Sequence, residues 1–187
     1  MDVLRALVAA AALLAAQPAQ AAHWNVDAAR SRLGFSVLWA GRPFAATFKT
    51  WRADIDFDPA DLSHSSADVL IDIASESSGD AETDAGVKGA QGFQASQFAT
   101  ARFRTAGFTR KSADHYEATA KLTIRGVTRT VTLPFTLTIA GDRAHMTGTA
   151  DVLRTDFGIG TGGDFSKPEP VAYEVSVQVD LTAWKAP

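Results

Sequence analysis

The residues best suited to chemistry in this chain are its carboxylates, and one group of them has a spacing seen in metal sites. Asp54, Asp56 and Asp58 alternate along the chain, as the carboxylates of a calcium-binding loop do. Ile55 and Phe57 fill the intervening positions at the period of a β-strand, and no glycine stands where a calcium loop must turn sharply. We therefore interpret the three carboxylates as the solvated face of a strand.

Histidine and cysteine suggest no other metal site. The four histidines, His23, His64, His115 and His145, fall in expected loops and strand ends without the spacing of zinc or haem ligands. The chain has no cysteine, which excludes thiol catalysis and thiolate metal sites. We predict that the protein binds no metal and uses no cofactor.

The glycine-rich segment 158–163 is the remaining motif with a chemical precedent. It follows no strand–helix–strand pattern, so it is better interpreted as a flexible gate than as a dinucleotide-binding loop. A Gly-x-Ser-x-Gly nucleophile motif is also missing, and we predict no catalytic residue and no enzymatic activity. Arg154 and Asp156 precede the segment. They are either turn and surface residues, or they order a loop over a ligand or contact its polar head group.

The N-terminus has the features of a secretory signal. Its apolar run at 6–16, of about eleven residues, is too short to cross a bilayer, and small residues at Ala19 and Ala21 fit a signal-peptidase site. We predict a signal peptide at 1–21, cleaved near Ala21, followed by a single domain at 22–187 in the periplasm.

The charge of the chain narrows the class of partner. The formal net charge is −3, and no cluster of lysine and arginine interrupts the sequence, so nucleic acid is not expected as a partner. Because the chain has no disulfide, its stability must come from a hydrophobic core and from sheet pairing.

Eight segments alternate apolar and polar residues at the period of two that identifies half-buried strands. They lie at 33–39, 44–57, 67–73, 101–105, 116–124, 131–139, 146–152 and 171–181. The apolar parity of the second segment changes near Lys49 and Thr50, which predicts a bulge within one strand. The alternation stops after the third segment, and 79–91 is predicted to be a loop that holds one short helix capped around Asp80.

The clearest hairpin is predicted at Arg125 and Gly126. If these two residues form the turn, Ile124 pairs with Val127, and the apolar residues of both strands face the same side. A second turn is expected at 141–142.

Sequential antiparallel strands of this kind form either a sandwich or an up-and-down barrel. The expected inward face favours a barrel because it holds many small residues, namely Ala46, Ala53, Ala67, Ala101, Ala118, Ala120, Gly148 and Ala150. We predict an all-β, eight-stranded antiparallel barrel with one short helix in a loop and room inside for one elongated ligand.

The candidate ligand-binding residues are large apolar and aromatic side chains, most of them on the inward faces of the expected strands. They are Phe35, Val37, Trp39, Phe48, Trp51, Ile55, Phe57, Val69, Ile71, Phe103, Tyr116, Leu122, Phe135, Phe157, Tyr173 and Val175.

Five segments of the sequence resemble the YceI-like family of exported, lipocalin-like proteins that bind polyisoprenoid lipids. These segments are 24–27, 31–35, 55–59, 122–129 and 154–160, and the Leu-Thr-Ile-Arg-Gly-Val-Thr-Arg hairpin at 122–129 is the most specific of them. The resemblance implies a lipocalin-like barrel with a helix near one end and an isoprenoid chain in a long apolar tunnel.

The resemblance also implies the function, for which two alternatives stay open. In the first, the protein is a periplasmic carrier or reservoir for a polyprenyl chain or an isoprenoid quinone. In the second, it is a non-catalytic partner of a membrane b-type cytochrome or another electron-transfer component, and the lipid is structural. Transient contact with a membrane fits either alternative, as does a monomer or a homodimer.

Overall fold

The computed structural model describes residues 21–187, so all but the last residue of the predicted signal peptide lies outside the described residues. Most of the described chain is β-strand, and α1 (Ala81–Lys88) is its one α-helix. No helix in this part of the chain is long and apolar enough to span a membrane.

The strands of the described chain form a single antiparallel sheet. They are β1 (Trp24–Val26), β2 (Arg32–Trp39), β3 (Arg42–Phe48), β4 (Trp51–Asp56), β5 (Ser66–Asp72), β6 (Glu76–Ser77), β7 (Thr100–Arg110), β8 (His115–Ile124), β9 (Val127–Ala140), β10 (Arg143–Leu153) and β11 (Val171–Lys185). Short 3-10 helices lie at Ala28–Arg30, Leu62–His64, Ile73–Ser75, Arg154–Phe157 and Gly163–Ser166.

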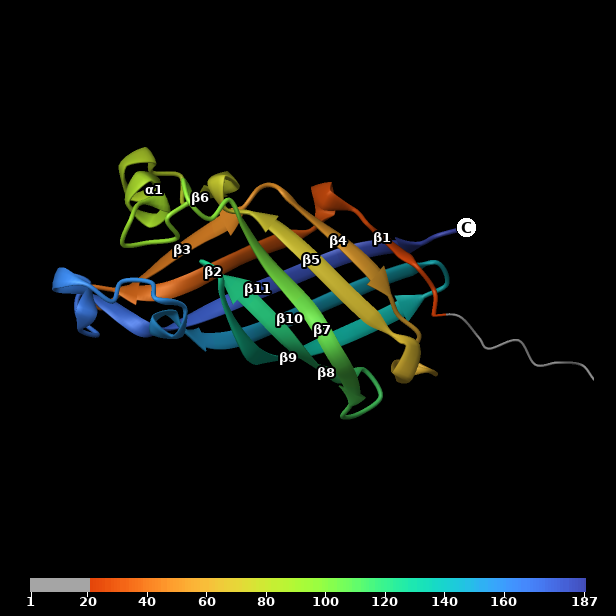
Figure 1. Ribbon diagram of the computed structural model, residues 1–187. Coiled ribbons are helices and arrows are strands. Elements are labelled where there is room, and N and C mark those ends of the chain that lie inside the picture. The colour runs from red at the N-terminus through yellow and green to blue at the C-terminus, as the bar shows by residue number, and fades with distance from the viewer. Residues whose placement is uncertain (1–20) are drawn as a thin grey trace, which may run out of the picture.

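The sheet curls strongly around its interior (Figure 1). Its strand order is β4-β5-β7-β8-β9-β10-β11-β2-β3-β6, and β1 pairs with β11 outside this path. The N-terminal segment also reaches β4, because His23 forms a bridge with Asp56 and the Phe57 amide donates to the Ala22 carbonyl at 2.8 Å. The predicted class, an antiparallel lipocalin-like β-fold with one short helix, is confirmed, although the sheet has eleven strands rather than eight.

The hairpin between β8 and β9 has the predicted register. Ile124 pairs with Val127, and the two turn residues have positive φ angles, 51° at Arg125 and 73° at Gly126. Both angles belong to a type I′ turn, whose twist matches that of the flanking strands. The turn predicted at 141–142 is also present, since Ala140 pairs with Arg143.

The bulge predicted near Lys49 and Thr50 is wrong. The chain ends one strand there and begins another, because β3 pairs with β2 and β6 whereas β4 pairs with β5. The Thr50 amide donates to Ser75 Oγ at 3.0 Å, and the Lys49 amide donates to the Ser75 carbonyl at 3.2 Å. The change of parity therefore marks the point where the chain passes from β3, next to one edge strand, to β4, the edge strand at the other end of the strand order.

Helix α1 lies where the sequence predicts it. Its N-cap is Asp80, whose carboxylate accepts a hydrogen bond from the Thr83 amide at 2.8 Å. Figure 1 shows α1 and the segment 154–170 at one end of the curled sheet and the C-terminus at the other end. The two ends therefore differ, and the α1 end carries most of the irregular chain.

Two clusters of buried side chains occupy the two ends of the interior. Phe35, Phe48 and Ile73 belong to the cluster on the α1 side, where the rings of Phe35 and Phe48 are 5.9 Å apart. Phe57 and Tyr116 belong to the other cluster, in an edge-to-face contact at 5.6 Å. Such contacts between aromatic rings stabilise the walls by more than the burial of their apolar area alone.

Strands β2 and β3 approach each other closely at Gly34. A Cβ atom on this residue would lie 2.6 Å from the backbone oxygen of Ala46, which is too close for any side chain. Gly107 in β7 is a contrasting case, because a Cβ atom there would meet nothing within 4 Å.

We expect Gly34→Ala to lower the free energy of unfolding by about 1–3 kcal/mol, because the backbone of β3 must move to admit the methyl group. Urea denaturation measures the change, and Gly107→Ala is the matched control. Equal unfolding midpoints for Gly34→Ala and Gly107→Ala would show that β2 and β3 separate easily at this point.

Candidate functional site

The larger of two interior cavities lies at the end of the sheet that carries α1. It has a volume of about 700 Å³. Strands β2, β3 and β11, helix α1 with the loop after it, and the segment 154–165 all contribute to its wall. Its large apolar side chains are Leu33, Phe35, Val37, Trp39, Phe44, Phe48, Ile71, Ile73, Val87, Phe93, Leu122, Ile124, Val152, Phe157, Ile159, Phe165, Val171, Val175 and Val177.

The smaller cavity adjoins the larger one and lies toward the opposite end. It has a volume of about 160 Å³, and its lining includes Trp24, Phe57, Phe135 and several alanines. Both cavities share the same five wall residues, Leu33, Ile71, Leu122, Val152 and Val177. The interior is thus one elongated apolar space that is narrowed where these five side chains meet.

Fourteen of the sixteen candidate ligand-binding residues line this space. Phe35, Val37, Trp39, Phe48, Phe157 and Val175 line the larger cavity, Trp51, Ile55, Phe57, Val69, Phe103 and Phe135 line the smaller one, and Ile71 and Leu122 line both. Period-two alternation brings the strand residues of this set to the inward face, as the sequence predicts, whereas Phe157 lies in the 3-10 helix Arg154–Phe157.

Tyr116 and Tyr173 lie outside both linings. Tyr116 is buried in the core and stacks on Phe135, with the ring centroids 5.5 Å apart. Tyr173 lies where the pairing of β11 with β2 is irregular, and its hydroxyl donates to the Ser166 carbonyl at 2.8 Å. Tyr116 therefore packs behind the lining residue Phe135, and Tyr173 lies where the register of β11 is irregular.

Sequence reasoning missed the wall residues contributed by α1 and the loop after it. Phe93 packs edge-on against Phe35 and Phe48, with both ring distances 5.8 Å, and Val87 of α1 lines the same cavity. Neither residue belongs to an alternating segment. The available signal was a lone aromatic residue and a lone valine within a polar stretch.

Arg154 is buried and orders the segment that covers one side of the larger cavity. Its side chain is 5% exposed, and its guanidinium lies 5.2 Å from the centre of the Tyr173 ring. Hydrogen bonds run from the guanidinium to the carbonyl oxygens of Ile159, Gly160, Phe165, Lys167, Val171 and Ala172. Burial lowers the pKa of Arg154 below the ordinary value for arginine.

These bonds distinguish among the roles that the sequence left open for Arg154. Every donor nitrogen of its guanidinium bonds to a backbone carbonyl, so Arg154 orders the loop rather than presenting a free charge to a ligand. Asp156 is exposed and takes no part in this network.

Arg125 connects three segments at the same end of the molecule. From the β8–β9 turn it donates to the Gly92 carbonyl at 3.1 Å, to the Gln94 side chain at 3.0 Å and to the Gly158 carbonyl. The Gly160 amide donates to the Gln91 carbonyl at 2.7 Å, which joins two of these segments directly. The loop after α1 and the segment 154–170 are therefore fixed to each other and to the sheet.

Glu76 is a buried carboxylate beneath α1. It is 1% exposed, and neither of its side-chain oxygens has a hydrogen-bond partner. Burial and the nearby Asp84 carboxylate raise the pKa of Glu76 from its ordinary value of 4.5 to about 7, although Lys88 Nζ lies 3.8 Å away and acts in the opposite direction. Loss of water thus outweighs the attraction of Lys88.

The structure places His23 beside two of the carboxylates considered above. Its Nδ1 atom lies 3.0 Å from Asp56 and 3.7 Å from Asp54. The possible ligand atoms of the three residues lie within 4.8 Å of one another on the surface. The sequence spacing did not indicate this grouping with two carboxylates, and the pairing of His23 with β4 fastens the N-terminal segment to the sheet.

A curled antiparallel sheet around an elongated apolar space defines the class of protein, a lipocalin-like fold built around an interior ligand cavity. The sequence identifies the family. Residues 24–183 match the YceI-like domain, and the chain belongs to this family.

Relatives with known sequences or structures agree with this assignment. A UPF0312 protein of Vibrio parahaemolyticus is 29% identical over 157 residues, which cover 79% of this chain and 83% of that protein. The crystal structure of BcnA from Burkholderia cenocepacia is 31% identical, with a TM-score of 0.81, and the match covers 84% of this chain and 99% of BcnA.

A more distant structural neighbour has the same fold. It is a polyisoprenoid binding domain from Saccharophagus degradans, which is 14% identical with a TM-score of 0.67. The match covers 88% of this chain and 99% of that domain.

We expect Arg154→Ala to destabilise the protein by at least about 3 kcal/mol, because several buried carbonyls lose their donor together. Hydrogen exchange of the amides in 158–172 should rise more than exchange in the paired strands. Arg129→Ala is the control, since Arg129 is exposed and donates to the neighbouring Thr128 carbonyl. Unchanged exchange in 158–172 for Arg154→Ala would contradict this role.

We expect Glu76 to make stability depend on pH. Below pH 4.5 the carboxyl is protonated in both the folded and the unfolded chain, so it imposes no penalty. Between pH 4.5 and about 7 the unfolded chain loses the proton first, and the free energy of unfolding falls as the pH rises.

Glu76→Gln should therefore stabilise the protein by up to roughly 3 kcal/mol at pH 8 relative to its effect at pH 4. Urea denaturation at both pH values measures this difference. Glu82→Gln, at an exposed position of α1, is the control. Equal effects of Glu76→Gln at the two pH values would mean that Glu76 ionises freely in the folded protein.

Proposed function

We propose that the protein binds an isoprenoid lipid, either a polyprenyl chain or an isoprenoid quinone, in its two adjoining cavities. The observation that carries this proposal is the elongated interior, walled almost entirely by aliphatic and aromatic side chains. Burial of a hydrocarbon chain yields roughly 0.8 kcal/mol per methylene group, so several prenyl units can be held without a charged anchor.

The proteins that this chain resembles support this class of ligand. The neighbour from Saccharophagus degradans is described as a polyisoprenoid binding domain, and this chain has the same fold. Membership of the YceI-like family agrees with a ligand of this kind.

The chemistry of the cavity walls favours binding over catalysis. Among the described residues, the polar side chains in the two linings are Glu82, Thr83, Gln91, Thr105 and Arg154. This set contains no histidine or cysteine, and the Arg154 guanidinium is already bound to backbone carbonyls. No nucleophile in it is paired with an evident base, as covalent catalysis would require.

The proposed role is that of a periplasmic carrier or reservoir. The secretory signal predicted at 1–21 supports the location. A lipid that is nearly insoluble in water needs an apolar container to leave a membrane, and the larger cavity offers one at the α1 end of the molecule.

The narrow point between the cavities gives a direct test. Val177 lines both cavities, so Val177→Trp should block passage from the larger to the smaller. We expect its affinity for solanesol, a long prenyl alcohol delivered from cyclodextrin, to fall by at least about tenfold in native mass spectrometry. Binding of the short prenyl alcohol farnesol should persist, because the larger cavity stays open.

Gln178→Trp is the matched control, because Gln178 is exposed and its side chain binds Ser36 at 2.7 Å on the outer face. Solanesol binding by Val177→Trp at the wild-type affinity would contradict a ligand that spans both cavities. A wild-type protein that binds neither alcohol would overturn the proposed function.

A further inference from the structure

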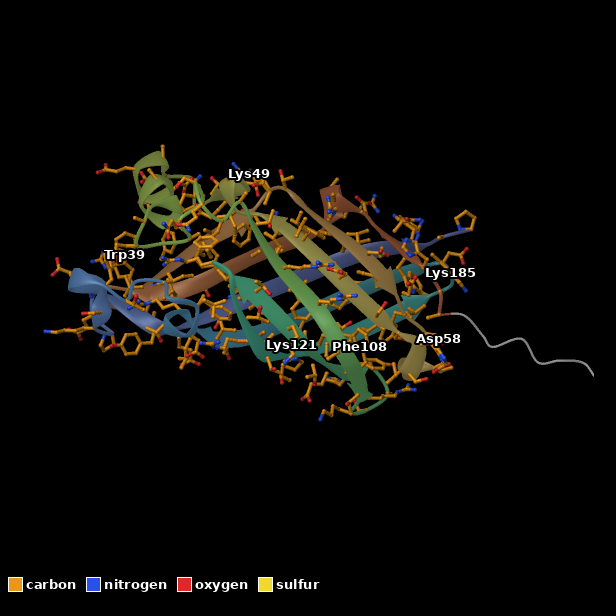
Figure 2. The ribbon with its side chains drawn as sticks, in the orientation of Figure 1. Trp39, Lys49, Asp58, Phe108, Lys121 and Lys185 are labelled. Atoms are coloured by element: carbon orange, nitrogen blue, oxygen red, sulfur yellow. The ribbon has the colours of Figure 1, made fainter. Side chains whose placement is uncertain are left out.

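Three large hydrophobic side chains are exposed in the described chain, and they lie at one end of the molecule. Leu38 is 52% exposed, Leu153 is 46% exposed and Trp39 is 39% exposed. Figure 2 shows Trp39 at the end that carries α1, with Asp58 and Lys185 at the opposite end. A single exposed apolar side chain is common on a protein surface, but several that gather at one place mark a contact surface.

Strand pairing places the two leucines on the outer wall beside each other. Val37 and Val152 line the larger cavity, so the next residues, Leu38 and Leu153, face outward. Their strands, β2 and β10, both pair with β11. The backbones of β2 and β10 are therefore two strand spacings, or about 10 Å, apart. The two leucines therefore flank β11 at the same end.

Trp39 connects this outer surface to the interior. It lines the larger cavity and is also partly exposed, so apolar surface continues from the cavity wall to the rim. Trp39 pairs with Val171, and the Ala40 amide donates to the Pro170 carbonyl at 2.6 Å. The rim is thus attached to the segment that Arg154 orders, and its position relative to the cavity is fixed.

We propose that this rim, formed by Leu38, Trp39 and Leu153, is the surface with which the protein contacts a lipid bilayer. The inference rests on the proposed function, because a long isoprenoid chain that crosses water between membrane and cavity would expose all of its apolar surface. Contact of the rim with the bilayer gives the chain an apolar path. An apolar surface continuous with a lipid cavity fits this partner better than a polar macromolecule.

Charge around the rim indicates that the contact is apolar rather than electrostatic. The exposed neighbours include Arg42 and Lys167 of one sign and Glu169 and Glu174 of the other. A rim of mixed charge gives no strong attraction to anionic lipids, so binding should not require them. Because the contact is apolar, binding to vesicles of zwitterionic phosphatidylcholine should change little with salt. Amphipathic Trp39 suits the interfacial layer of such vesicles.

The test compares wild type with the double variant Leu38→Ser, Leu153→Ser, whose changes lie outside the cavity. We expect the double variant to lose co-sedimentation with phosphatidylcholine vesicles and to take up solanesol from them at least tenfold more slowly. Its equilibrium binding of solanesol from cyclodextrin should stay within twofold of wild type. The double variant Thr149→Ser, Gln178→Ser, at exposed positions farther along β10 and β11, is the control.

The outcomes separate the two proposals. Uptake from vesicles by Leu38→Ser, Leu153→Ser at the wild-type rate overturns the bilayer contact but leaves cavity binding intact. Wild type that sediments with vesicles through the rim, yet binds no solanesol from cyclodextrin, supports the contact and overturns the proposed ligand. Analytical ultracentrifugation adds a third outcome, since rim-dependent dimers without vesicle binding would assign the surface to a second copy of the chain.

Discussion

The structure depends on the pairing of one continuous antiparallel sheet around an interior that its own side chains do not fill. Each strand from β5 to β3 in the sheet order has hydrogen-bonded neighbours on both sides. With no disulfide in the chain, this pairing and the aromatic contacts within the walls must hold the fold. Small inward residues such as Ala101, Ala118 and Ala150 leave space that a fully packed core would not have.

The two sides of the larger cavity are held by different chemistry. Arg154 and Arg125 fix the segment 154–170 through bonds to backbone carbonyls, which irregular chain cannot satisfy by itself. Helix α1 is short, and its link to the sheet includes Lys88, which donates to the Glu76 carbonyl at 2.9 Å. The α1 side of the cavity is therefore attached to the sheet next to the buried carboxyl of Glu76.

Period-two alternation predicted the inward faces of the strands, because one residue in two must face the interior wherever a sheet has one buried side. It correctly placed Phe35, Val37 and Trp39 along one wall, and it gave the correct register for the two-residue turn at Arg125–Gly126. Alternation could not distinguish a bulge from a change of strand at Lys49 and Thr50, since both reverse the parity.

The sequence by itself determined the class of fold, the inward faces and the position of the one helix, because these follow from local periodicity, capping and turn chemistry. Only the tertiary structure decided that Arg154 bonds to carbonyls as distant as Ala172, that Phe93 completes an aromatic wall and that the buried Glu76 carboxylate has no hydrogen-bond partner. These features depend on contacts between segments far apart in the chain, and neither the periodicity nor the spacing of one segment encodes its distant neighbours.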